Sequence, residues 1–336
     1  MTLGLGIDTS FDDTAVAVVE DGVKIHANLT VSQFAEHEAF GGVIPERASR
    51  LHIQMILPLI DEALTEADVT LDAIDYCAVA NRPGLMGSLL VGVTTAKALS
   101  VAQNLPLIGI NHLEAHVYAV HMEHPDLQFP YVSLLISGAN TIIFHHRSHT
   151  DFQVLGCTLD DAVGECIDKC GRHLGLTMPA GPALQELALG GDETKWDLPR
   201  PMLHKPGLSM SFSGLKTAVL YLLRDNPHAN REDVAASLLS AITDVLTARV
   251  QKAARESDVK SIVLCGGAAA NKQIREGFDA MARRNNWQVK WPSIALCTDN
   301  AAMIAGLGHA AYLSGDRAPL DLPVKATVSW KAEGRS

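Results

Sequence analysis

Hydrophobic and polar positions follow two different periods along the first part of the chain. Short apolar runs bounded by turn residues predict an opening group of three strands, at residues 3–8, 15–19 and 23–29. Helical spacing and further apolar runs then predict, in order, a helix at about 45–67, a strand at 76–80, a helix at about 88–103 and a strand at 107–110. This part of the chain therefore predicts three strands followed by alternating helix and strand.

The same pattern restarts near residue 131. Strands are predicted at 131–136, 141–146 and 152–155, then helices and a Pro/Gly-rich stretch, and later further strands at 261–265 and 288–291. The echo predicts a duplicated α/β lobe. We expect a first lobe at residues 1–129, completed by about 300–336, and a second lobe at 130–299 with a helical and Pro/Gly-rich insertion at about 160–230. Two such lobes facing each other make a natural cleft for a nucleotide.

Composition limits the classes of function. The chain has 336 residues, 47% of them hydrophobic, which is enough for two lobes of ordinary domain size. Its 27 Lys and Arg against 38 Asp and Glu give a net charge of −11. Because such a surface repels a polyphosphate, contact with nucleic acid needs a local basic patch or a partner protein. Composition thus argues against a free-standing nucleic-acid binder.

Cysteine usage and the opening residues predict a cytoplasmic protein. The six cysteines form no C-x-x-C pair and several lie in apolar runs, as reduced thiols do. The first residues match a buried strand and not a secretion signal. The apolar stretch at 83–110 is interrupted by Lys97 and Pro106, so it predicts a buried helix followed by a strand and no membrane span.

Two histidines, His112 and His116, are spaced one helical turn apart, which suits a shared metal ion. Among 14 histidines about half such a pair is expected by chance, and His145 with His149 is a second instance. His112 follows directly on a predicted buried strand, whereas the second pair lies in a polar loop. We therefore expect His112 and His116 to be ligands. Asp299, at the start of a predicted helix, is either a third ligand or an ordinary helix cap.

Carboxylates and small residues gather at turns that follow predicted strands. Asp8, Asp12 and Asp13 surround the first turn, where carboxylates typically bind a cation through water or act as bases. Small residues at 137–140 and 266–268 suit a close approach of backbone N–H groups to phosphate, although tight turns use them without any ligand. Neither the Walker pattern nor G-x-G-x-x-G occurs.

Seven ordered motifs together resemble one family, the bacterial TsaD proteins and their archaeal and eukaryotic counterparts. The resemblance covers nearly the whole chain. Its motifs are Gly6-Ile7-Asp8-Thr9-Ser10, Gly41-Gly42-Val43-Ile44-Pro45-Glu46, His112-Leu113-Glu114-Ala115-His116, Ile136-Ser137-Gly138, Phe212-Ser213-Gly214-Leu215-Lys216-Thr217, Gly266-Gly267 with Asn271, and Cys297-Thr298-Asp299-Asn300.

The resemblance implies the two-lobed actin/sugar-kinase/Hsp70-like fold. It also implies transfer of a threonylcarbamoyl group from its adenylate to the exocyclic amine of an adenosine beside the tRNA anticodon. His112, His116 and Asp299 would bind a divalent metal, Fe²⁺ or else Zn²⁺. Asp12 or Asp13 would take the amine proton. The residues that would hold ATP or threonylcarbamoyl-AMP are Leu135, Ile136, Ser137, Gly138, Ala139, Asp168, Gly181 and Asn271. Implied partners are tRNA and accessory proteins of the TsaB and TsaE type, with the adenylate made by a TsaC-type enzyme.

Several positions depart from the family pattern. Phe11 replaces a usual Cys, Asp13 a usual Glu, Arg82 a usual Gly, and Ala139 a second Gly. If Ala139 adopts a positive φ so that its N–H faces a phosphate, alanine imposes a strain of roughly 1 kcal/mol. We expect a strained turn there.

Other classes use parts of the same pattern. An actin-fold ATPase or small-molecule kinase would share the fold and the turns but needs no histidine pair. A metallopeptidase is disfavoured because no Glu directly follows His112. An inactive scaffold is disfavoured because His112, His116 and Asp299 are all present.

Overall fold

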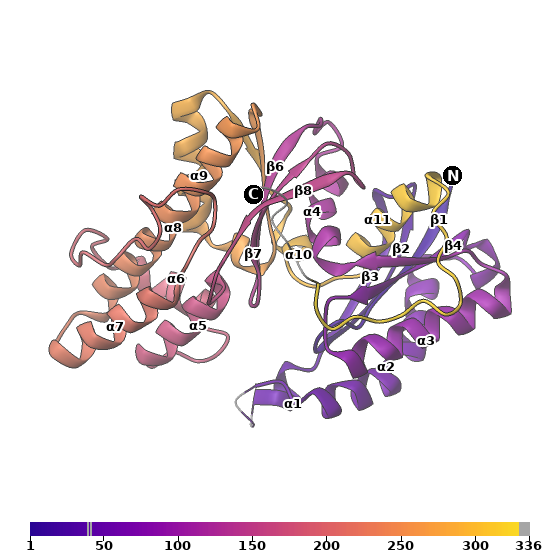
Figure 1. Ribbon diagram of the computed structural model, residues 1–336. Coiled ribbons are helices and arrows are strands. Elements are labelled where there is room, and N and C mark those ends of the chain that lie inside the picture. Colours follow the sequence, from indigo (N-terminus) through magenta and orange to yellow (C-terminus); the bar gives the residue numbers. More distant parts are fainter. Residues whose placement is uncertain (39, 41, 329–336) are drawn as a thin grey trace. The chain divides into compact units, whose positions relative to one another are not determined.

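The computed structural model describes residues 1–38, 40 and 42–328 and divides the chain into two compact units (Figure 1). Among the described residues, the first unit holds 1–127 and 292–328, and the second holds 128–291. The chain thus leaves the first unit once and returns to it.

The first unit is built on a five-stranded sheet of order β3-β2-β1-β4-β5. β1, β2 and β3 are antiparallel neighbours, while β4 and β5 extend the sheet in parallel with β1. The strands are β1 (Leu3–Asp8), β2 (Asp13–Glu20), β3 (Lys24–Ser32), β4 (Tyr76–Arg82) and β5 (Leu107–Asn111). The helices are α1 (Phe34–Glu38), α2 (Pro45–Glu66), η1 (Leu71–Ala73), α3 (Met86–Gln103), α4 (His112–Glu123), α10 (Ile294–Cys297) and α11 (Ala302–Leu313).

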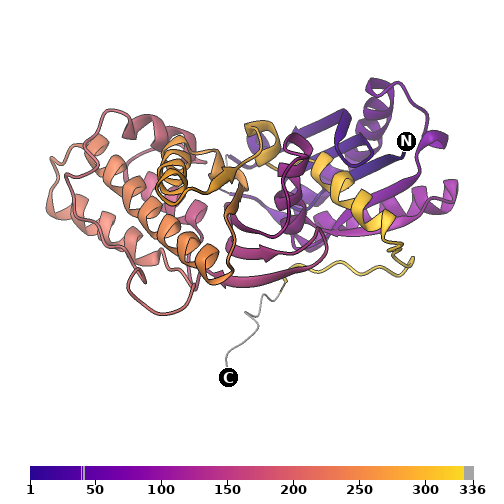
Figure 2. The ribbon, with the colours of Figure 1, turned by 90° about the horizontal axis from the view of Figure 1, so that it is seen from above.

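Alternation along β1 separates the two faces of this sheet. Leu5 and Ile7 join the apolar layer with α2 and α3. On the opposite face, a Cβ at Gly4 or Gly6 would collide with its neighbours, and at Gly6 it would lie 2.3 Å from the carbonyl oxygen of Ala301. Glycine therefore lets the start of α11 lie directly on β1. Figure 1 and Figure 2 both show α11, in yellow, beside the indigo N-terminal strands.

The second unit repeats this topology with a sheet of order β10-β9-β6-β7-β8. β6, β7 and β8 form the antiparallel group, and β9 pairs in parallel with β6 and β10. The strands are β6 (Tyr131–Ile136), β7 (Thr141–His146), β8 (Phe152–Cys157), β9 (Ser261–Cys265) and β10 (Gln288–Lys290). The helices are α5 (Val163–His173), α6 (Gly181–Ala188), α7 (Ser213–Asp225), α8 (Arg231–Glu256), η2 (Gly267–Ala270) and α9 (Lys272–Asn285). The repeated hydrophobic pattern thus corresponds to a second sheet of the same topology.

The return to the first unit occurs at Pro292, earlier than the boundary expected near residue 300. The reason is α10, which packs against α4, while the N–H of Ser293 donates to the carboxylate of Glu123 at 2.5 Å. Residues 292–299, including Asp299, consequently belong to the first unit.

The apolar stretch at 83–110 forms most of α3 and β5. Over the described part of the chain, no helix is both long and apolar enough to cross a bilayer.

Candidate metal centre and donor-binding turns

His112 and His116 project from the first turns of α4, directly after β5. The side chain of Asn111 caps this helix by accepting from the N–H of Leu113 at 3.0 Å. The cap fixes where the helix starts, and the i, i+4 spacing then puts both imidazoles on one face. Both rings are buried, with exposed fractions of 2% and 1%. The local sequence thus determines that the two imidazoles lie on the same face of α4.

Asp299, between α10 and α11, completes a three-membered cluster. The Nε2 atoms of His112 and His116 lie 3.1 Å apart, and Asp299 Oδ1 lies 3.5 Å from the first and 3.1 Å from the second. Tetrahedral zinc with bonds of about 2.0–2.1 Å has ligand atoms about 3.3 Å apart, so these separations fit one metal ion. The Asp299 side chain is 31% exposed, which leaves one side of the cluster accessible. No other group of this kind occurs within residues 1–38, 40 and 42–328.

A second carboxylate orients the first imidazole. His112 Nδ1 lies 2.7 Å from Asp8 Oδ2 and 3.1 Å from Ser10 Oγ, so Nδ1 carries the proton and Nε2 points into the cluster. Metal-binding histidines commonly bond a carboxylate in this way. Asp8 is itself fixed, because its other oxygen accepts from the N–H of Ser10 at 2.9 Å.

Burial and the two neighbouring carboxylates set the protonation of the cluster. Burial lowers the pKa of His112, but the carboxylates of Asp8 and Asp299 outweigh burial and raise the pKa to about 10. Burial lowers the pKa of His116, which keeps its imidazole neutral and able to donate a lone pair. Burial alone would raise the pKa of Asp299, yet the two imidazoles hold that pKa well below its usual range. Without an ion His112 is therefore protonated on both nitrogens, and a metal ion would have to displace the Nε2 proton to use it as a ligand. With that proton displaced, the group offers two nitrogen ligands and one anionic oxygen.

Asp12 and Asp13 stand in the loop before β2 and at its first residue. Burial raises the pKa of Asp12, and burial together with the charge of Asp299 raises that of Asp13 to about 6. Phe11, which precedes them, packs its ring edge against His112, with centroids 5.7 Å apart. Two carboxyls with raised pKa values thus lie beside the cluster, as candidate bases should.

Of the candidate donor residues in the second unit, 135–139 lie at the end of β6 and in the turn after it, and Asn271 follows β9 and η2. Asp168 lies on α5, and Gly181 begins α6. In the hairpin at 137–140 the N–H of Ser137 donates to the carbonyl of Asn140 at 2.9 Å. A Cβ built at Gly138, Gly181 or Gly267 would meet no described atom within 4 Å. These three glycines therefore face open space, which suits backbone contact with a ligand.

The remaining donor candidates already make internal contacts. Leu135 and Ile136 are fully buried in β6, so they offer a ligand only their main chain. Asp168 accepts from the N–H of Ala180 at 2.8 Å, and Asn271 caps α9 through its side chain. These bonds fix the starts of α6 and α9. The structure thus gives Asp168 and Asn271 structural roles besides any contact with a ligand.

The strained turn expected at Ala139 is wrong. Neither Ala139 nor Gly138 has a positive φ. The positive φ occurs at Gly266, at 87°, where a Cβ would lie 2.6 Å from the carbonyl oxygen of Ile136. The hairpin accepts alanine without backbone strain, so an Ala139→Gly substitution has no strain to relieve.

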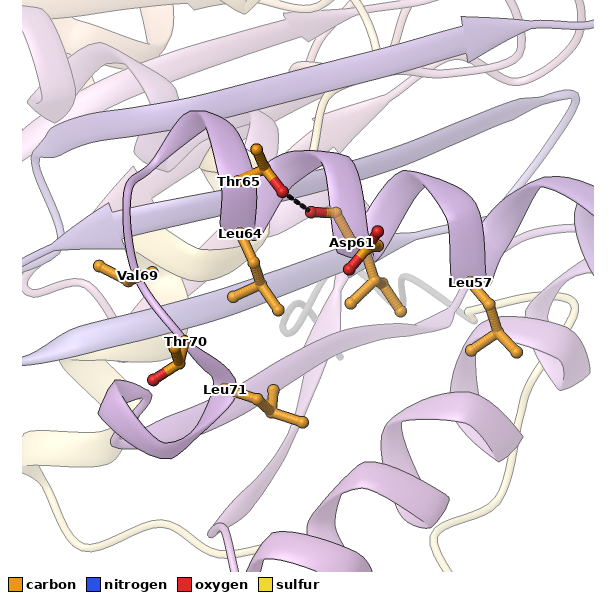
Figure 3. A pocket seen from close by; sticks show the side chains of 8 residues that line it. Leu57, Asp61, Leu64, Thr65, Val69, Thr70 and Leu71 are labelled. Atoms are coloured by element: carbon orange, nitrogen blue, oxygen red, sulfur yellow. Dashed lines mark hydrogen bonds between the residues drawn. The ribbon is translucent and has the colours of Figure 1, made fainter.

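A groove beside α2 is lined by residues that belong to none of these sites (Figure 3). Its volume is about 510 Å³, and its lining residues are Leu57, Ile60, Asp61, Leu64, Thr65, Val69, Thr70 and Leu71. It contains one carboxylate and no imidazole, and it shares no residue with the metal cluster. We assign no chemistry to it.

Sequence reasoning missed the second layer of polar residues around the first turn. Ser10 bonds His112, and His52 bonds the carbonyl oxygen of Phe11 at 2.9 Å. The available signal was weak, because a serine in a turn and a single histidine in a helix have many other uses.

The fold defines the class of protein. Two α/β units, each with an antiparallel three-strand group extended by parallel strands, form the actin-like architecture. HypF of T. kodakarensis superimposes with a TM-score of 0.66 at 15% identity, covering 94% of this chain and 48% of HypF. Component A of (R)-2-hydroxyglutaryl-CoA dehydratase from Acidaminococcus fermentans gives 0.56 at 16% identity, covering 93% and 98%. At these identities the likeness concerns the fold alone.

Sequence similarity defines the family. A family model for TsaD, described as tRNA N6-adenosine threonylcarbamoyltransferase, matches residues 24–306. The enzyme of that name from Carboxydothermus hydrogenoformans is 46% identical over 318 residues, 95% of each chain. That from Bacillus cereus is 44% identical over 326 residues, 96% of this chain and 94% of the relative. The chain belongs to the TsaD family, which makes it a transferase of tRNA threonylcarbamoyladenosine biosynthesis and confirms the resemblance carried by the seven motifs.

Proposed function

We propose that the chain transfers the threonylcarbamoyl group of threonylcarbamoyl-AMP to the exocyclic amine of the adenosine adjacent to the anticodon, in tRNAs that read codons beginning with A. The His112–His116–Asp299 cluster, with His112 oriented by Asp8, is the observation that supports this most strongly in a chain of the TsaD family. The new bond joins the adenine nitrogen to the carbamoyl carbon, and the bond from that carbon to the phosphate oxygen breaks to release AMP.

In this proposal His112, His116 and Asp299 hold one divalent metal, Fe²⁺ or Zn²⁺. Two imidazole nitrogens and one carboxylate oxygen suit either ion, and the exposed side of Asp299 leaves access for a substrate. When bound, the metal supplies Lewis acidity to the carbamoyl carbonyl, which an adenine amine needs because it is a poor nucleophile. Asp8, bonded to Nδ1 of His112, would keep Nε2 turned toward the other two ligands once the ion has displaced its proton.

The nucleotide part of the donor, or ATP, belongs to the second unit. Main-chain groups of Leu135, Ile136, Ser137, Gly138 and Ala139, together with Asp168, Gly181 and Asn271, hold it. The open space at Gly138 and Gly181 supports this assignment, since N–H groups there can approach a phosphate closely.

One carboxyl of the first turn accepts the amine proton. Asp13 has a pKa of about 6 and is mostly ionised at neutral pH while still basic enough to take a proton. Asp12 stands beside it, also with a raised pKa. The roles of the two carboxyls are separated by the Asp→Asn exchanges discussed below.

The partners are tRNA, accessory proteins of the TsaB and TsaE type and a TsaC-type enzyme that makes the adenylate, all in the cytoplasm. The net charge of −11 supports a need for helpers in tRNA binding.

The test supplies threonylcarbamoyl-AMP, unmodified tRNA and the accessory proteins to the metal-loaded chain, then digests the tRNA for nucleoside analysis. We expect threonylcarbamoyladenosine with the wild type and at least about 100-fold less with His116→Ala. In a parallel reaction supplied with ATP, phosphoryl transfer to a small-molecule acceptor, with no modified nucleoside in the first reaction, would instead indicate the kinase alternative. Cleavage of a peptide substrate would indicate a metallopeptidase. Absence of all three activities would indicate an inactive scaffold.

A further inference from the structure

A chain of buried polar side chains, which the proposed chemistry does not use, runs from Phe11 to Ile44 in the first unit. His52 of α2 lies at its centre: Nε2 is 2.9 Å from the carbonyl oxygen of Phe11, and Nδ1 is 2.7 Å from Thr14 Oγ1. Gln33 Nε2 approaches His52 Nδ1 at 3.3 Å. His52 and Thr14 are 0% exposed and Gln33 is 3% exposed. Buried polar groups at this depth need partners, and these have them.

The partners fix the tautomer of His52. A carbonyl oxygen can only accept, so His52 Nε2 carries the proton and donates to Phe11. Nδ1 then accepts from the hydroxyl of Thr14 and the amide of Gln33. Burial lowers the pKa of His52, in agreement with a neutral ring.

The far end of the chain is consistent with this direction. Gln33 Oε1 accepts from His37 Nε2 at 3.3 Å, and His37 Nδ1 accepts from the N–H of Ile44 at 3.4 Å. The hydrogen bonds of the network therefore run in one direction, from Ile44 to Phe11. His37, Gln33 and His52 each accept at one end and donate at the other, so the arrangement of one fixes the next.

The network ends on the loop that carries the two candidate bases. His52 holds the carbonyl of Phe11, and the main-chain N–H of Gln33 holds the carbonyl of Asp12 at 3.1 Å. The two carbonyls before Asp13 are thus both held from outside the loop. The ring of Phe11 also packs against His112, so this short segment touches the metal cluster on one side.

From these contacts we infer that His52 is a positioning residue: with Gln33, it fixes the backbone of Phe11 to Asp13 so that the carboxyls face the cluster of His112, His116 and Asp299. The inference rests on the proposed function for its effect on rate, but the position of the loop can be measured without it. The link that matters is the Nε2 donor of His52, because among the described residues it supplies the hydrogen bond from α2 to Phe11.

Two substitutions of His52 test its two ring nitrogens, Nε2 and Nδ1, one at a time. His52→Gln places an amide N–H where Nε2 stands and can still reach Phe11, whereas His52→Asn has its polar atoms at the level of Nδ1 and leaves the Phe11 carbonyl without a donor. Thr14→Val removes only the hydroxyl that anchors Nδ1 and preserves shape, so it serves if His52→Asn does not fold. Amide hydrogen exchange at residues 10–14, metal content, kcat and KM are measured for all variants and for the wild type.

We expect His52→Asn to speed amide exchange at residues 10–14 and to lower kcat about 10- to 100-fold, since small misplacements of catalytic groups cost that much. KM for tRNA and for the donor should change by less than about threefold, and metal content should stay the same. His52→Gln should resemble the wild type in exchange and rate, and Thr14→Val should fall between the two.

Amide exchange decides the inference by itself. Equal exchange at residues 10–14 in the wild type and in His52→Asn overturns it, and so does equal loosening of this loop by Asn and Gln. An inactive wild type with the expected exchange pattern contradicts the proposed function and still supports the positioning role.

Discussion

At the scale of single residues, the two histidines of the cluster differ in what holds the far side of each ring. His112 Nδ1 bonds a carboxylate at 2.7 Å, whereas His116 Nδ1 is buried with no hydrogen-bond partner among the described residues. His112 is therefore oriented by charge and His116 by packing.

The first prediction concerns metal content. His112→Ala, His116→Ala and Asp299→Ala should each strip most of the bound metal, because each removes one of the ligand atoms that lie within 4.8 Å of one another. Elemental analysis of anaerobically purified protein measures this and identifies the metal.

His145→Ala and His149→Ala are the matched controls, because this pair has the same sequence spacing. His145 lies on β7 and His149 packs against Phe129 with ring centroids 4.9 Å apart. Both variants should keep the metal. Equal metal loss in the two sets of variants would overturn the assignment.

The second prediction concerns Asp13 and pH. Its pKa is about 6 in the folded chain and about 3.9 when unfolded, so the folded state is favoured by protonation. The stabilising contribution is complete below about pH 4 and is lost as pH rises through about 6. Asp13→Asn should therefore raise the free energy of unfolding at pH 8 by roughly 1–2 kcal/mol, a value reduced for partial solvent access. Denaturant melts at about pH 4 and 8 measure the difference.

If Asp13 is the base, the same exchange abolishes most of the activity while stabilising the chain, as expected when a functional group is buried at a cost. The rate of the wild type should rise with pH through about 6. Asp12→Asn is the comparison, since Asp12 has a similar setting. Stabilisation of equal size at both pH values would show that Asp13 ionises normally.

At the scale of elements, β1 and the start of α11 depend on the absence of a side chain. Gly6→Ala would place a Cβ 2.3 Å from the main-chain oxygen of Ala301, two residues beyond Asp299. Backbone cannot move aside cheaply, so we expect a loss of about 1–3 kcal/mol in stability and weaker metal binding through displaced Asp299. Thermal melts and metal titration measure the two effects.

Gly42→Ala is the control for this third prediction, because a Cβ at Gly42 meets no described atom within 4 Å. It should change stability by less than about 0.5 kcal/mol. A Gly6→Ala variant as stable as this control would show that α11 does not lie so close to β1.

The same elements show what sequence could and could not predict. The hydrophobic pattern predicts the repeated strand group, because each strand is a short apolar run bounded by turn residues, which is visible in the local sequence. The spacing of His112 and His116 predicted their shared face for the same reason. By contrast, the unit to which Asp299 belongs depends on α10 packing against α4, a contact between residues far apart in sequence. The prediction of a strained turn at Ala139 is wrong because a glycine that is usual in a family need not have a positive φ, and here the positive φ lies at Gly266.

At the scale of the whole molecule, charge is unevenly distributed along the chain. Residues 249–290 contain nine Lys and Arg against four Asp and Glu, in a chain whose total is −11. Arg283 and Arg284 end α9 as exposed side chains, and neither forms an ion pair with any described residue. Cations at a helix C-terminus also favour the helix dipole, so part of this charge serves stability.

The fourth prediction concerns tRNA. Because the chain carries a net charge of −11, the isolated chain should bind tRNA no tighter than about 10⁻⁶ M at physiological salt, the range of non-specific binding. Whatever binding remains should come from phosphate contacts, so log K should fall steeply with log salt. Reversing two exposed cations, Arg283→Glu with Arg284→Glu, should weaken binding severalfold at low salt and reduce the slope by about 1–2. Fluorescence anisotropy over a salt series measures both quantities.

Lys272→Glu, at the other end of the same helix, separates a local patch from net charge. Lys272 is exposed but is 3.8 Å from Glu276, so its charge is already balanced locally. If the basic end of α9 meets the tRNA backbone, Lys272→Glu changes affinity and salt slope much less than reversal at Arg283 and Arg284. If tRNA affinity depends only on the total charge of the chain, a plot of affinity against net charge places all these variants on one line. A submicromolar wild-type affinity at physiological salt would mean that the chain needs no accessory protein to hold its substrate, and the argument from acidity would be wrong.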